Sequence, residues 1–370
     1  MANQALYRKY RPKTFGEIVG QEHVVQTLRN ALASDLISHA YLFSGPRGSG
    51  KTSLARLLAK GVNCLSRSKN GEPCNTCSAC VEFNEGKAMD LIEIDAASNR
   101  GIDEIRDLKE GIAFSPIKLK YKVFIVDEAH QLTKEAANAL LKTLEEPPAH
   151  AIFVLATTEP QKMIATIISR CQRFDFRRFT IQEILKRLNM IVLREGADVQ
   201  PEALELIALG ASGSLRDAES LLDKVLTFHS SFATTKKISA EEVRELLGII
   251  DLATISEFAQ LLYEKKASQA IAFLHKSLEE GIDPQEFLKA LSTYLRYTLL
   301  LKVSPKLEET ILAGFTKEQV EKMKAQSKQY EEKDLQKTLE HFLSAETKMK
   351  YSSIPQLPLE LAIIDSCGVV

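Results

Sequence analysis

The chain has 370 residues, which is long for a single hydrophobic core, so we expect two or three domains. Its composition, 45% hydrophobic and 26% charged, is that of an ordinary globular protein, and no apolar run is long enough to span a bilayer. A net charge of −1 excludes a globally basic nucleic-acid binder, so any DNA contact must come from a local patch. Since the N-terminus lacks a signal-peptide pattern, we expect a cytoplasmic protein without a membrane partner.

A basic and aromatic segment at residues 7–12 precedes a first helix, predicted at 22–34. If the domain that follows holds a nucleotide, this segment could lie over the base and make apolar contacts with adenine. The candidate residues for this contact are Tyr10, Arg11, Pro12 and Val19. The alternative is a basic N-terminal arm with no role in binding, since terminal segments are often poorly ordered.

Residues 45–52 match the phosphate-binding P-loop pattern G-x-x-x-x-G-K-[ST] at every constrained position. An apolar strand pattern precedes them at 40–43 and a helix pattern follows at 53–59, which is the context that the motif requires. The glycines allow successive backbone N–H groups to face phosphate oxygens. Lys51 is expected to reach the β- and γ-phosphates, and the Thr52 hydroxyl to hold Mg²⁺. The full set of candidate phosphate-binding residues is Gly45, Pro46, Arg47, Gly48, Ser49, Gly50, Lys51 and Thr52.

Four of the six cysteines follow the P-loop helix in the spacing Cys64-x9-Cys74-x2-Cys77-x2-Cys80. Dense cysteines in a cytosolic chain indicate a metal site rather than disulfides. Four thiolates complete a tetrahedral Zn²⁺ site and leave no position for water, which favours a structural metal. An iron–sulfur cluster and unligated thiols are the alternatives. The cysteines would form an insertion between the P-loop helix and the next strand.

Two acidic residues end a buried strand predicted at 123–126, which follows a strand at 91–95 and a helix at about 102–112. Such a strand is the second half of a nucleoside triphosphatase site. Asp127 is expected to orient Mg²⁺ and its waters, and Glu128 to polarise the attacking water as a general base. The alternative is a pair of acids that only begin a loop.

A helix predicted at 133–146 ends at two prolines, and a further buried strand follows at 151–158. This strand ends in hydroxyl side chains. A polar residue at this strand end could sense the γ-phosphate or position the attacking water. The alternative is a threonine that only caps a turn.

Strands and helices alternate up to about residue 178, which predicts an α/β domain with a parallel sheet covered by helices on both faces. The pattern is helical from about residue 180 onward, with a linker predicted at 230–239. The predicted helices lie at 181–195, 201–209, 213–225, 240–247, 252–265, 267–279, 284–302, 317–327, 333–350 and 355–367.

These stretches together resemble the AAA+ clamp-loader ATPases, and most closely the gamma/tau subunit family of bacterial DNA polymerase III. The basic segment, the P-loop and the four-cysteine insertion follow one another as they do in that family. The quoted motifs are Asp127-Glu128-Ala129-His130, similar to the Walker B motif, Ser169-Arg170-Cys171, similar to the family signature, and Gly213-Ser214-Leu215-Arg216-Asp217, similar to the sensor 2 motif. The resemblance covers essentially the whole chain.

The resemblance implies roles for three further residues. Thr158 would be sensor 1, and Arg216 would be sensor 2, acting on the γ-phosphate in the same chain. Arg170 would be an arginine finger that acts on ATP held by the adjacent subunit. Cationic groups in such positions stabilise the charge that develops during phosphoryl transfer. Each arginine on its own could instead form a surface salt bridge.

The resemblance also implies a P-loop AAA+ domain at 1–178 with a zinc module at about 62–84, a helical lid domain at 179–242 and an all-α collar domain at 243–370. The implied cofactors are ATP, Mg²⁺ and structural Zn²⁺. The implied partners are the delta and delta prime subunits, further gamma/tau copies, the beta sliding clamp and primer–template DNA, contacted through its backbone. Arg100 and Lys142 are candidate DNA contacts, and ordinary solvated charges are the alternative.

The implied function is that of an ATPase motor that opens the sliding clamp and loads it on primer–template DNA. Two rival functions remain. The Asp-Glu-Ala-His tetrad also occurs in helicase-like motors that translocate along nucleic acid. A non-hydrolysing loader scaffold is the second rival, but such subunits lose the P-loop lysine or the acidic pair, whereas Lys51, Thr52, Asp127 and Glu128 are all present here.

Overall fold

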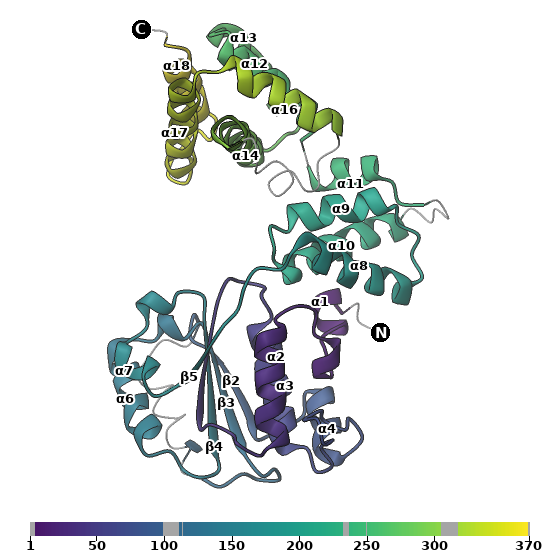
Figure 1. The fold of residues 1–370 in the computed structure, drawn as a ribbon, viewed down its shortest axis with the longest axis vertical. Coiled ribbons are helices and arrows are strands. Elements are labelled where there is room, and N and C mark those ends of the chain that lie inside the picture. The colour runs from purple at the N-terminus through teal and green to yellow at the C-terminus, as the bar shows by residue number, and fades with distance from the viewer. Residues whose placement is uncertain are drawn as a thin grey trace. The chain divides into compact units, whose positions relative to one another are not determined.

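The computed structural model describes residues 4–98, 111–112, 114–231, 237–248, 250–304 and 317–368. Contacts divide the chain into two units, one made of residues 1–198 and 207–235 and the other of residues 199–206 and 236–370 (Figure 1). Arg100 and all but the last two residues of the helix predicted at 102–112 lie outside the described residues.

A five-stranded sheet in the order β2-β3-β4-β1-β5 forms the centre of the first unit, and each neighbouring pair of strands is parallel. The strands are β1 (Ala40–Ser44), β2 (Leu91–Asp95), β3 (Lys122–Asp127), β4 (Ala151–Thr157) and β5 (Gln172–Asp175). The register places Asp95 beside Asp127, and Ser44 between Thr157 and Asp175. Because parallel strands end at one edge of the sheet, these polar residues gather there. The predicted parallel sheet is confirmed.

Alternate residues of the central strands face two separate cores, because side chains in a strand point to opposite faces in turn. Tyr41 and Phe43 belong to one core, and Leu42 and Phe153 belong to the other. The covering helices are α2 (Glu22–Ala33) and α3 (Lys51–Asn63) on the first face, and α6 (Lys134–Glu145) and α7 (Ala165–Ile168) on the second (Figure 1). Both faces of the sheet are therefore covered, as the sequence pattern predicts.

Shorter elements connect these layers. They are α1 (Leu6–Lys9), η1 (Phe15–Glu17), α4 (Ser78–Glu85), η2 (Ala129–Gln131) and η3 (Pro160–Lys162). Three longer helices follow the sheet in sequence, α8 (Ile181–Glu195), α9 (Pro201–Gly210) and α10 (Leu215–Ser231). A capping box formed by Thr180 and Glu183 begins α8, and Gly196 ends it in the left-handed conformation.

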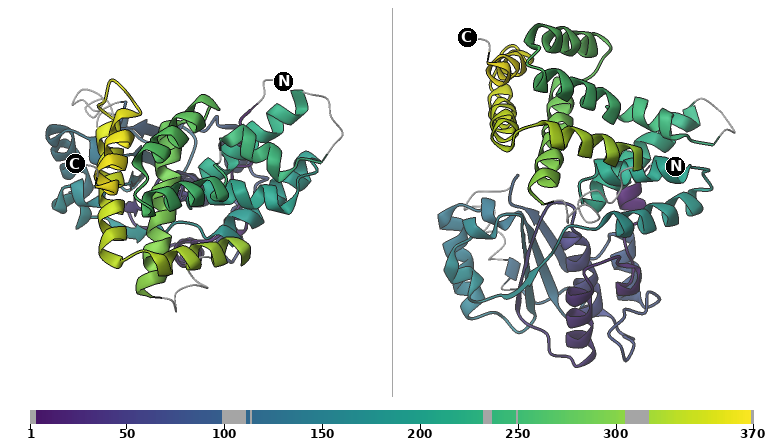
Figure 2. Two further views of the ribbon diagram at one scale, coloured as in Figure 1. Left: turned by 90° about the horizontal axis from the view of Figure 1, so that it is seen from above. Right: turned by 45° about the horizontal axis from the view of Figure 1, so that its top comes forward.

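The second unit consists of helices in the described part of the chain, as the views in Figure 2 show. They are α11 (Ala240–Leu247), α12 (Leu252–Tyr263), α13 (Ala267–Glu279), α14 (Pro284–Val303), α16 (Lys317–Gln329), α17 (Glu332–Met349) and α18 (Leu357–Cys367). Phe258, Phe287 and Phe342 are fully buried in their shared core. These bounds agree with the predicted helices to within a few residues.

No single helix among the described residues is both long and apolar enough to cross a membrane. The helices α11 and α12 reach that length and composition only as a pair, and the pair is bent by 58°.

Candidate active site

Glycines shape the loop between β1 and α3. Gly50 has a φ of 96° and directly precedes the first residue of α3, so the helix N-terminus opens onto the loop. Gly48 has a φ of 73°, and a Cβ atom at this position would lie 2.0 Å from Ser214 Oγ. The Gly48 carbonyl also accepts a hydrogen bond from the backbone of Leu215 at 3.3 Å. The P-loop is therefore in direct contact with the start of α10.

The remaining P-loop side chains differ in burial. Ser49 is buried, and its hydroxyl has no hydrogen-bond partner among the described residues. Buried polar atoms in native proteins nearly always have a partner, so this hydroxyl fits a phosphate oxygen. Arg47 is exposed, and Pro46 is half-buried. The loop thus offers backbone N–H groups and one buried hydroxyl, which are donors suited to an anion.

Lys51 begins α3 and is buried at the carboxyl edge of the sheet. Its Nζ atom donates hydrogen bonds to the carbonyls of Gly45 at 2.8 Å and Pro46 at 2.9 Å. Burial lowers the pKa of Lys51, while the carboxylates of Glu128 and Asp127 oppose this shift. The lysine cation is thus held close to the predicted acidic pair.

Asp127 and the P-loop meet through one short contact. Thr52 Oγ1 donates a hydrogen bond to Asp127 Oδ2 at 2.8 Å, across 75 positions of sequence. A hydroxyl and a carboxylate are both oxygen ligands of the kind that Mg²⁺ prefers. The two residues predicted to hold Mg²⁺ therefore lie together, and their chemistry fits that ion.

Glu128 directly follows β3, and its carboxylate lies close to Thr158, which follows β4. Thr158 donates two hydrogen bonds to Glu128 Oε2, one from its backbone N–H at 3.2 Å and one from Oγ1 at 2.9 Å. The φ of Glu128 is 49°, in the left-handed region that residues with a Cβ atom rarely adopt. Such backbone strain concentrates at functional sites, so we regard this conformation as support for a role of Glu128 in chemistry.

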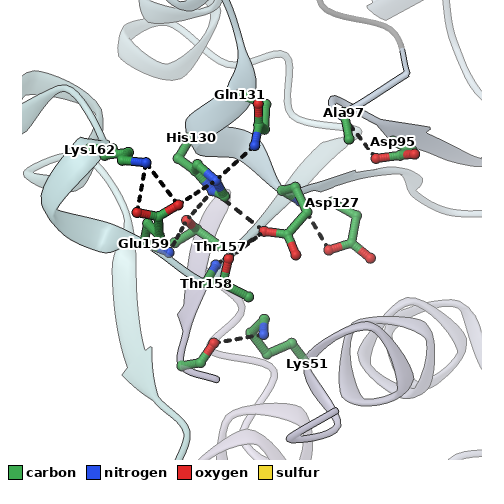
Figure 3. Close-up of polar contacts among 12 residues, drawn as sticks. Lys51, Asp95, Ala97, Asp127, His130, Gln131, Thr157, Thr158, Glu159 and Lys162 are labelled. Carbon is green, nitrogen blue, oxygen red and sulfur yellow. Dashed lines mark hydrogen bonds and ion pairs between the residues drawn. The ribbon is translucent and has the colours of Figure 1, made fainter. Parts of the chain in front are cut away.

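A histidine that the sequence analysis did not assign joins the same cluster. His130 Nδ1 lies 2.9 Å from Thr157 Oγ1 and 3.4 Å from Glu128 Oε2, and its Nε2 lies 3.4 Å from Glu159 Oε1 (Figure 3). Lys162 in turn pairs with Glu159 at 2.8 Å. The sequence did contain a signal that His130 belongs to this cluster. It is the histidine of the Asp-Glu-Ala-His tetrad, and its position next to the acidic pair places it at the same edge of the sheet.

The predicted adenine-contact residues lie in a segment with few regular elements. Tyr10 follows α1, and Tyr10, Arg11, Pro12 and Val19 are all half-buried. The Nε atom of Arg11 is buried and has no hydrogen-bond partner in the described part of the chain. Gln21, two residues after Val19, is buried and donates a hydrogen bond to the carbonyl of Arg177 at 2.7 Å.

Of the two predicted arginines, Arg216 is exposed and Arg170 is half-buried, and both have partners in this chain. Arg216, on the first turn of α10, lies over the ring of Tyr7, 4.9 Å from its centroid. Arg170 follows α7, and its guanidinium pairs with Glu145 at 2.6 Å and donates a hydrogen bond to the carbonyl of Thr166 at 2.8 Å. In the described part of the chain, the partners of the two arginines are thus Tyr7, Glu145 and Thr166, and none of these belongs to the P-loop or the acidic pair.

Four cysteines form a compact cluster beside α3. The sulfur atoms of Cys64, Cys74, Cys77 and Cys80 all lie within 4.8 Å of one another. Hydrogen bonds from the backbone N–H groups of Thr76 and Cys77, the latter 3.3 Å from Cys74 Sγ, lower the pKa of the Cys74 thiol to about 5. Burial raises the pKa of Cys80. Four converging sulfurs fit a tetrahedral metal ion with thiolate ligands.

Lys60 is a buried residue of α3 that the sequence analysis did not assign. It donates hydrogen bonds to the carbonyl of Lys13 at 2.5 Å, to Asn75 Oδ1 at 2.6 Å and to Asn84 Oδ1 at 2.9 Å. Burial lowers its pKa, and the nearby thiols of Cys80 and Cys64 are among the groups that oppose this shift. The only sequence signal was a lysine on an otherwise buried helix, which gives no indication of its partners.

A parallel sheet with a P-loop after β1, an acidic pair after β3 and a following set of helices defines the AAA+ class of P-loop ATPases. Solved structures of the Thermotoga maritima RuvB Holliday junction branch migration motor share this fold. The likeness has a TM-score of 0.50 at 19% identity, over 72% of this chain and 85% of the RuvB chain, and shows the fold alone.

Within this class, family models identify three successive regions. Residues 20–180 match the model described as DNA polymerase III, delta subunit. Residues 183–230 match the DNA polymerase III clamp loader subunit, ATPase lid domain. Residues 238–369 match DNA polymerase III subunits gamma and tau domain III.

The chain belongs to the gamma/tau subunit family of DNA polymerase III. It is 34% identical to DNA polymerase III subunit gamma of Buchnera aphidicola (Acyrthosiphon pisum), over 98% of both chains. It is 44% identical to DNA polymerase III subunit tau of Bacillus subtilis over 99% of this chain and 64% of that protein. For subunit tau of Escherichia coli the identity is 41%, over 82% of this chain and 46% of that protein. The chain thus spans roughly half to two thirds of these tau subunits' length.

Proposed function

We propose that this chain is an ATPase motor subunit of a bacterial clamp loader. It would couple ATP binding and hydrolysis to the opening of a sliding clamp and its loading on primer–template DNA. The observation that carries the proposal is the contact between Thr52 and Asp127, which brings the P-loop and the acidic pair to one edge of the sheet. The family membership and the match to a clamp loader lid support it further.

The P-loop and Asp127 would hold the phosphates and their counterion. Lys51 would supply a cation in a site removed from water, where attraction to phosphate is stronger than in bulk solvent. Thr52 and Asp127 would provide adjacent oxygen ligands for Mg²⁺. When bound, this ion would neutralise charge on the phosphate oxygens.

Glu128 would accept a proton from the attacking water as a general base. The two hydrogen bonds from Thr158 hold its carboxylate at the end of β4, which supports a positioning role for Thr158 as sensor 1. His130 would support the same carboxylate, since its Nδ1 lies 3.4 Å from the same oxygen, Oε2. The carboxylate would thus be held by one group that follows β3 and one that follows β4.

Two arginines would complete the site from outside the sheet. Arg216, as sensor 2, would act on the γ-phosphate in the same chain, and the contact between Gly48 and Leu215 supports this because it brings the start of α10 to the P-loop. Arg170, as a finger, would act on ATP in a neighbouring subunit. Its position outside the acidic cluster of its own chain is compatible with action in trans.

The adenine base would lie against Tyr10, Arg11, Pro12 and Val19.

The four-cysteine cluster would hold a structural Zn²⁺ ion with all four thiolates as ligands, and its role would be to shape the insertion. The boundaries proposed for the domains remain 1–178, 179–242 and 243–370.

The proposed partners are the delta and delta prime subunits, further gamma/tau copies, the beta sliding clamp and the DNA backbone. Lys142 is exposed on α6 and remains a candidate for a DNA contact. The proposed location is the cytoplasm.

The test is the steady-state ATPase rate of this chain assembled with its sibling loader subunits, measured with and without sliding clamp and primed DNA. Strong stimulation that requires both the clamp and a primer–template junction is the expected result. An ATPase rate that does not depend on the clamp and increases with the length of single-stranded DNA would instead show a translocating motor. ATP binding without turnover under every condition would show a non-hydrolysing scaffold.

A further inference from the structure

A buried arginine of α8 binds the segment that carries the proposed adenine contacts. Arg187 is 4% exposed. Its Nε donates a hydrogen bond to Glu219 Oε1 on α10 at 2.7 Å, and its Nη2 donates one to the backbone carbonyl of Tyr10. Because a guanidinium carries several donors in a fixed plane, one side chain can hold both acceptors. Arg187 therefore connects two helices that follow the sheet with a segment 177 positions earlier in the sequence.

The Arg187–Glu219 pair is fully enclosed by protein. Burial raises the pKa of Glu219, and the guanidinium of Arg187 opposes that rise. A buried ion pair contributes little net stability compared with apolar side chains of similar volume. The pair itself therefore adds little to the stability of α8 and α10.

Other contacts between these helices and the segment are more exposed. The backbone N–H of Leu6 donates a hydrogen bond to Asp223 Oδ2 at 3.2 Å, and Lys9 pairs with Glu195 at 2.6 Å. The Lys9 side chain is 48% exposed, and exposed ion pairs contribute little. The contact from Arg187 is thus the buried anchor on this side.

A residue of α3 and a residue of the insertion hold the other end of the segment. Lys60 donates a hydrogen bond to the carbonyl of Lys13, and the backbone N–H of Phe15 donates one to Glu72 Oε2 at 2.9 Å. Arg11, whose buried Nε has no partner among the described residues, lies between the two anchors in sequence. The stretch proposed to receive the base is therefore held at both ends by side chains from distant parts of the first unit.

We propose that Arg187 is a positioning residue of the ATP site, which holds the carbonyl of Tyr10 and so fixes the conformation in which residues 10–12 receive adenine. The inference rests on the proposed function. The P-loop contacts phosphates, which all nucleoside triphosphates share, whereas this segment meets the base. Loss of Arg187 therefore weakens the base-dependent part of binding and leaves the phosphate-dependent part intact.

The test is equilibrium binding of fluorescent mant-ATP and mant-GTP to the full chain. The double variant Arg187→Met, Glu219→Leu removes both charges and leaves neither unpaired. We expect its dissociation constant for ATP to rise about tenfold, while that for GTP changes less than about twofold. Arg187→Lys keeps the positive charge but lacks the planar guanidinium. It should therefore raise the dissociation constant for ATP as well. This variant provides a second test if the double variant does not fold.

Two comparisons separate this inference from the function on which it rests. Arg244→Met removes a surface arginine that pairs with Glu241, and should change neither dissociation constant. Lys51→Ala should weaken ATP and GTP alike, because it removes a phosphate contact. If the Arg187 variants keep the wild-type preference for ATP over GTP, or lose affinity for both nucleotides equally, Arg187 has no positioning role. That result would leave the proposed ATP site unaffected. If the wild-type chain binds neither nucleotide, both proposals are wrong.

Discussion

The side chain of Glu128, half-buried directly after β3, is held in place by neighbouring polar groups. Its left-handed backbone costs about 1–3 kcal/mol for a residue with a Cβ atom. The hydrogen bonds from Thr158 and the approach of His130 help to offset this cost. At the scale of single residues, neighbouring side chains therefore hold the carboxylate of Glu128 in one position.

Thr158→Val tests the role of the threonine hydroxyl, because valine keeps the shape of the side chain and removes one of the two hydrogen bonds to Glu128. We expect the turnover number of the assembled ATPase to fall by about 10- to 100-fold. ATP affinity should stay within about twofold of wild type, since the P-loop is intact. The measurements are steady-state hydrolysis and equilibrium ATP binding.

Thr158→Ser is the matched control, because serine retains the hydroxyl, and its turnover should be close to that of wild type. Equal losses in the valine and serine variants would mean that the hydroxyl has no special role.

Residues of the site differ in how far the sequence could predict them. The sequence motifs predicted that four residues lie close together, because each motif belongs at the end of a strand. These residues are Lys51, Thr52, Asp127 and Glu128. Arg187 was not, because its acceptor is the carbonyl of Tyr10, and any residue type offers a carbonyl. No pattern of residue types can encode such a contact.

At the scale of elements, the cysteine insertion and the capped start of α8 each depend on a small number of polar groups. The insertion packs few buried apolar side chains of its own, with Ala79 and Cys80 the buried residues of α4. A short element with so small a core needs further cross-links to hold its shape. The four thiols and Lys60 supply such links.

Cys77→Ser should release the bound metal, because a hydroxyl is a poor replacement for a thiolate ligand of Zn²⁺. We expect bound zinc to fall from about one ion per chain toward zero, with a lower melting temperature for the insertion. ATP binding through the P-loop should persist. Zinc content is measured by atomic absorption on the purified chain.

Cys171→Ala provides the comparison for this experiment. Burial raises the pKa of Cys171 to about 11, and this cysteine lies outside the four-sulfur cluster. Its variant should retain a full complement of zinc. If Cys77→Ser also retains it, the cluster does not hold zinc through all four sulfurs.

The capping box of α8 predicts a pH dependence. The Arg177 guanidinium, aided by hydrogen bonds from Thr180, lowers the pKa of Glu183 to about 2 from an ordinary value of 4.5. A lowered pKa contributes stability that is complete above pH 4.5 and is lost as the pH falls toward 2. Glu183→Gln should therefore destabilise the first unit by about 1 kcal/mol at pH 7, and by progressively less below pH 4.5.

Urea unfolding of the variant and the wild type across this pH range measures the effect. Glu22→Gln is the control, since Glu22 is 77% exposed and lies 3.6 Å from the same arginine. Its effect should be much smaller at every pH. A Glu183→Gln penalty that does not change with pH would contradict the assignment.

Most elements were predictable from periodicity, because buried strands and amphipathic helices leave a strong pattern in the sequence. The strand at 151–158 and the helix at 267–279 are two examples in which the structure agrees closely. The packing between elements was less predictable, since it depends on pairs that lie far apart in sequence. Gly48 and Ser214 are one such pair. The sequence analysis explained this glycine by phosphate binding alone and gave no indication of its contact with Ser214.

At the scale of the whole molecule, the proposed function requires groups from more than one chain. Arg170 illustrates this point. Within its own chain it pairs with Glu145, and its side chain is 34% exposed. An arginine in this position can serve a neighbouring subunit or can be a surface ion pair, and the two roles predict different results.

Arg170→Ala should leave ATP binding unchanged and lower the turnover of the assembled loader by about a thousandfold, as expected for a finger acting in trans. Glu145→Ala is the matched control, because it removes the same ion pair and keeps the arginine. Its turnover should equal that of wild type. Unchanged turnover in Arg170→Ala, or equal losses in both variants, would make Arg170 a structural residue.

The hydrogen bond between Leu6 and Asp223 also has a consequence for protein synthesis, because its partners are 217 positions apart. A ribosome adds about 5–20 residues per second, so on the order of ten to forty seconds pass between the two residues. During that interval the segment before the P-loop has emerged without the helices that hold it. The sheet can assemble in the meantime, but the hydrogen bond from Leu6 cannot form until α10 has been made.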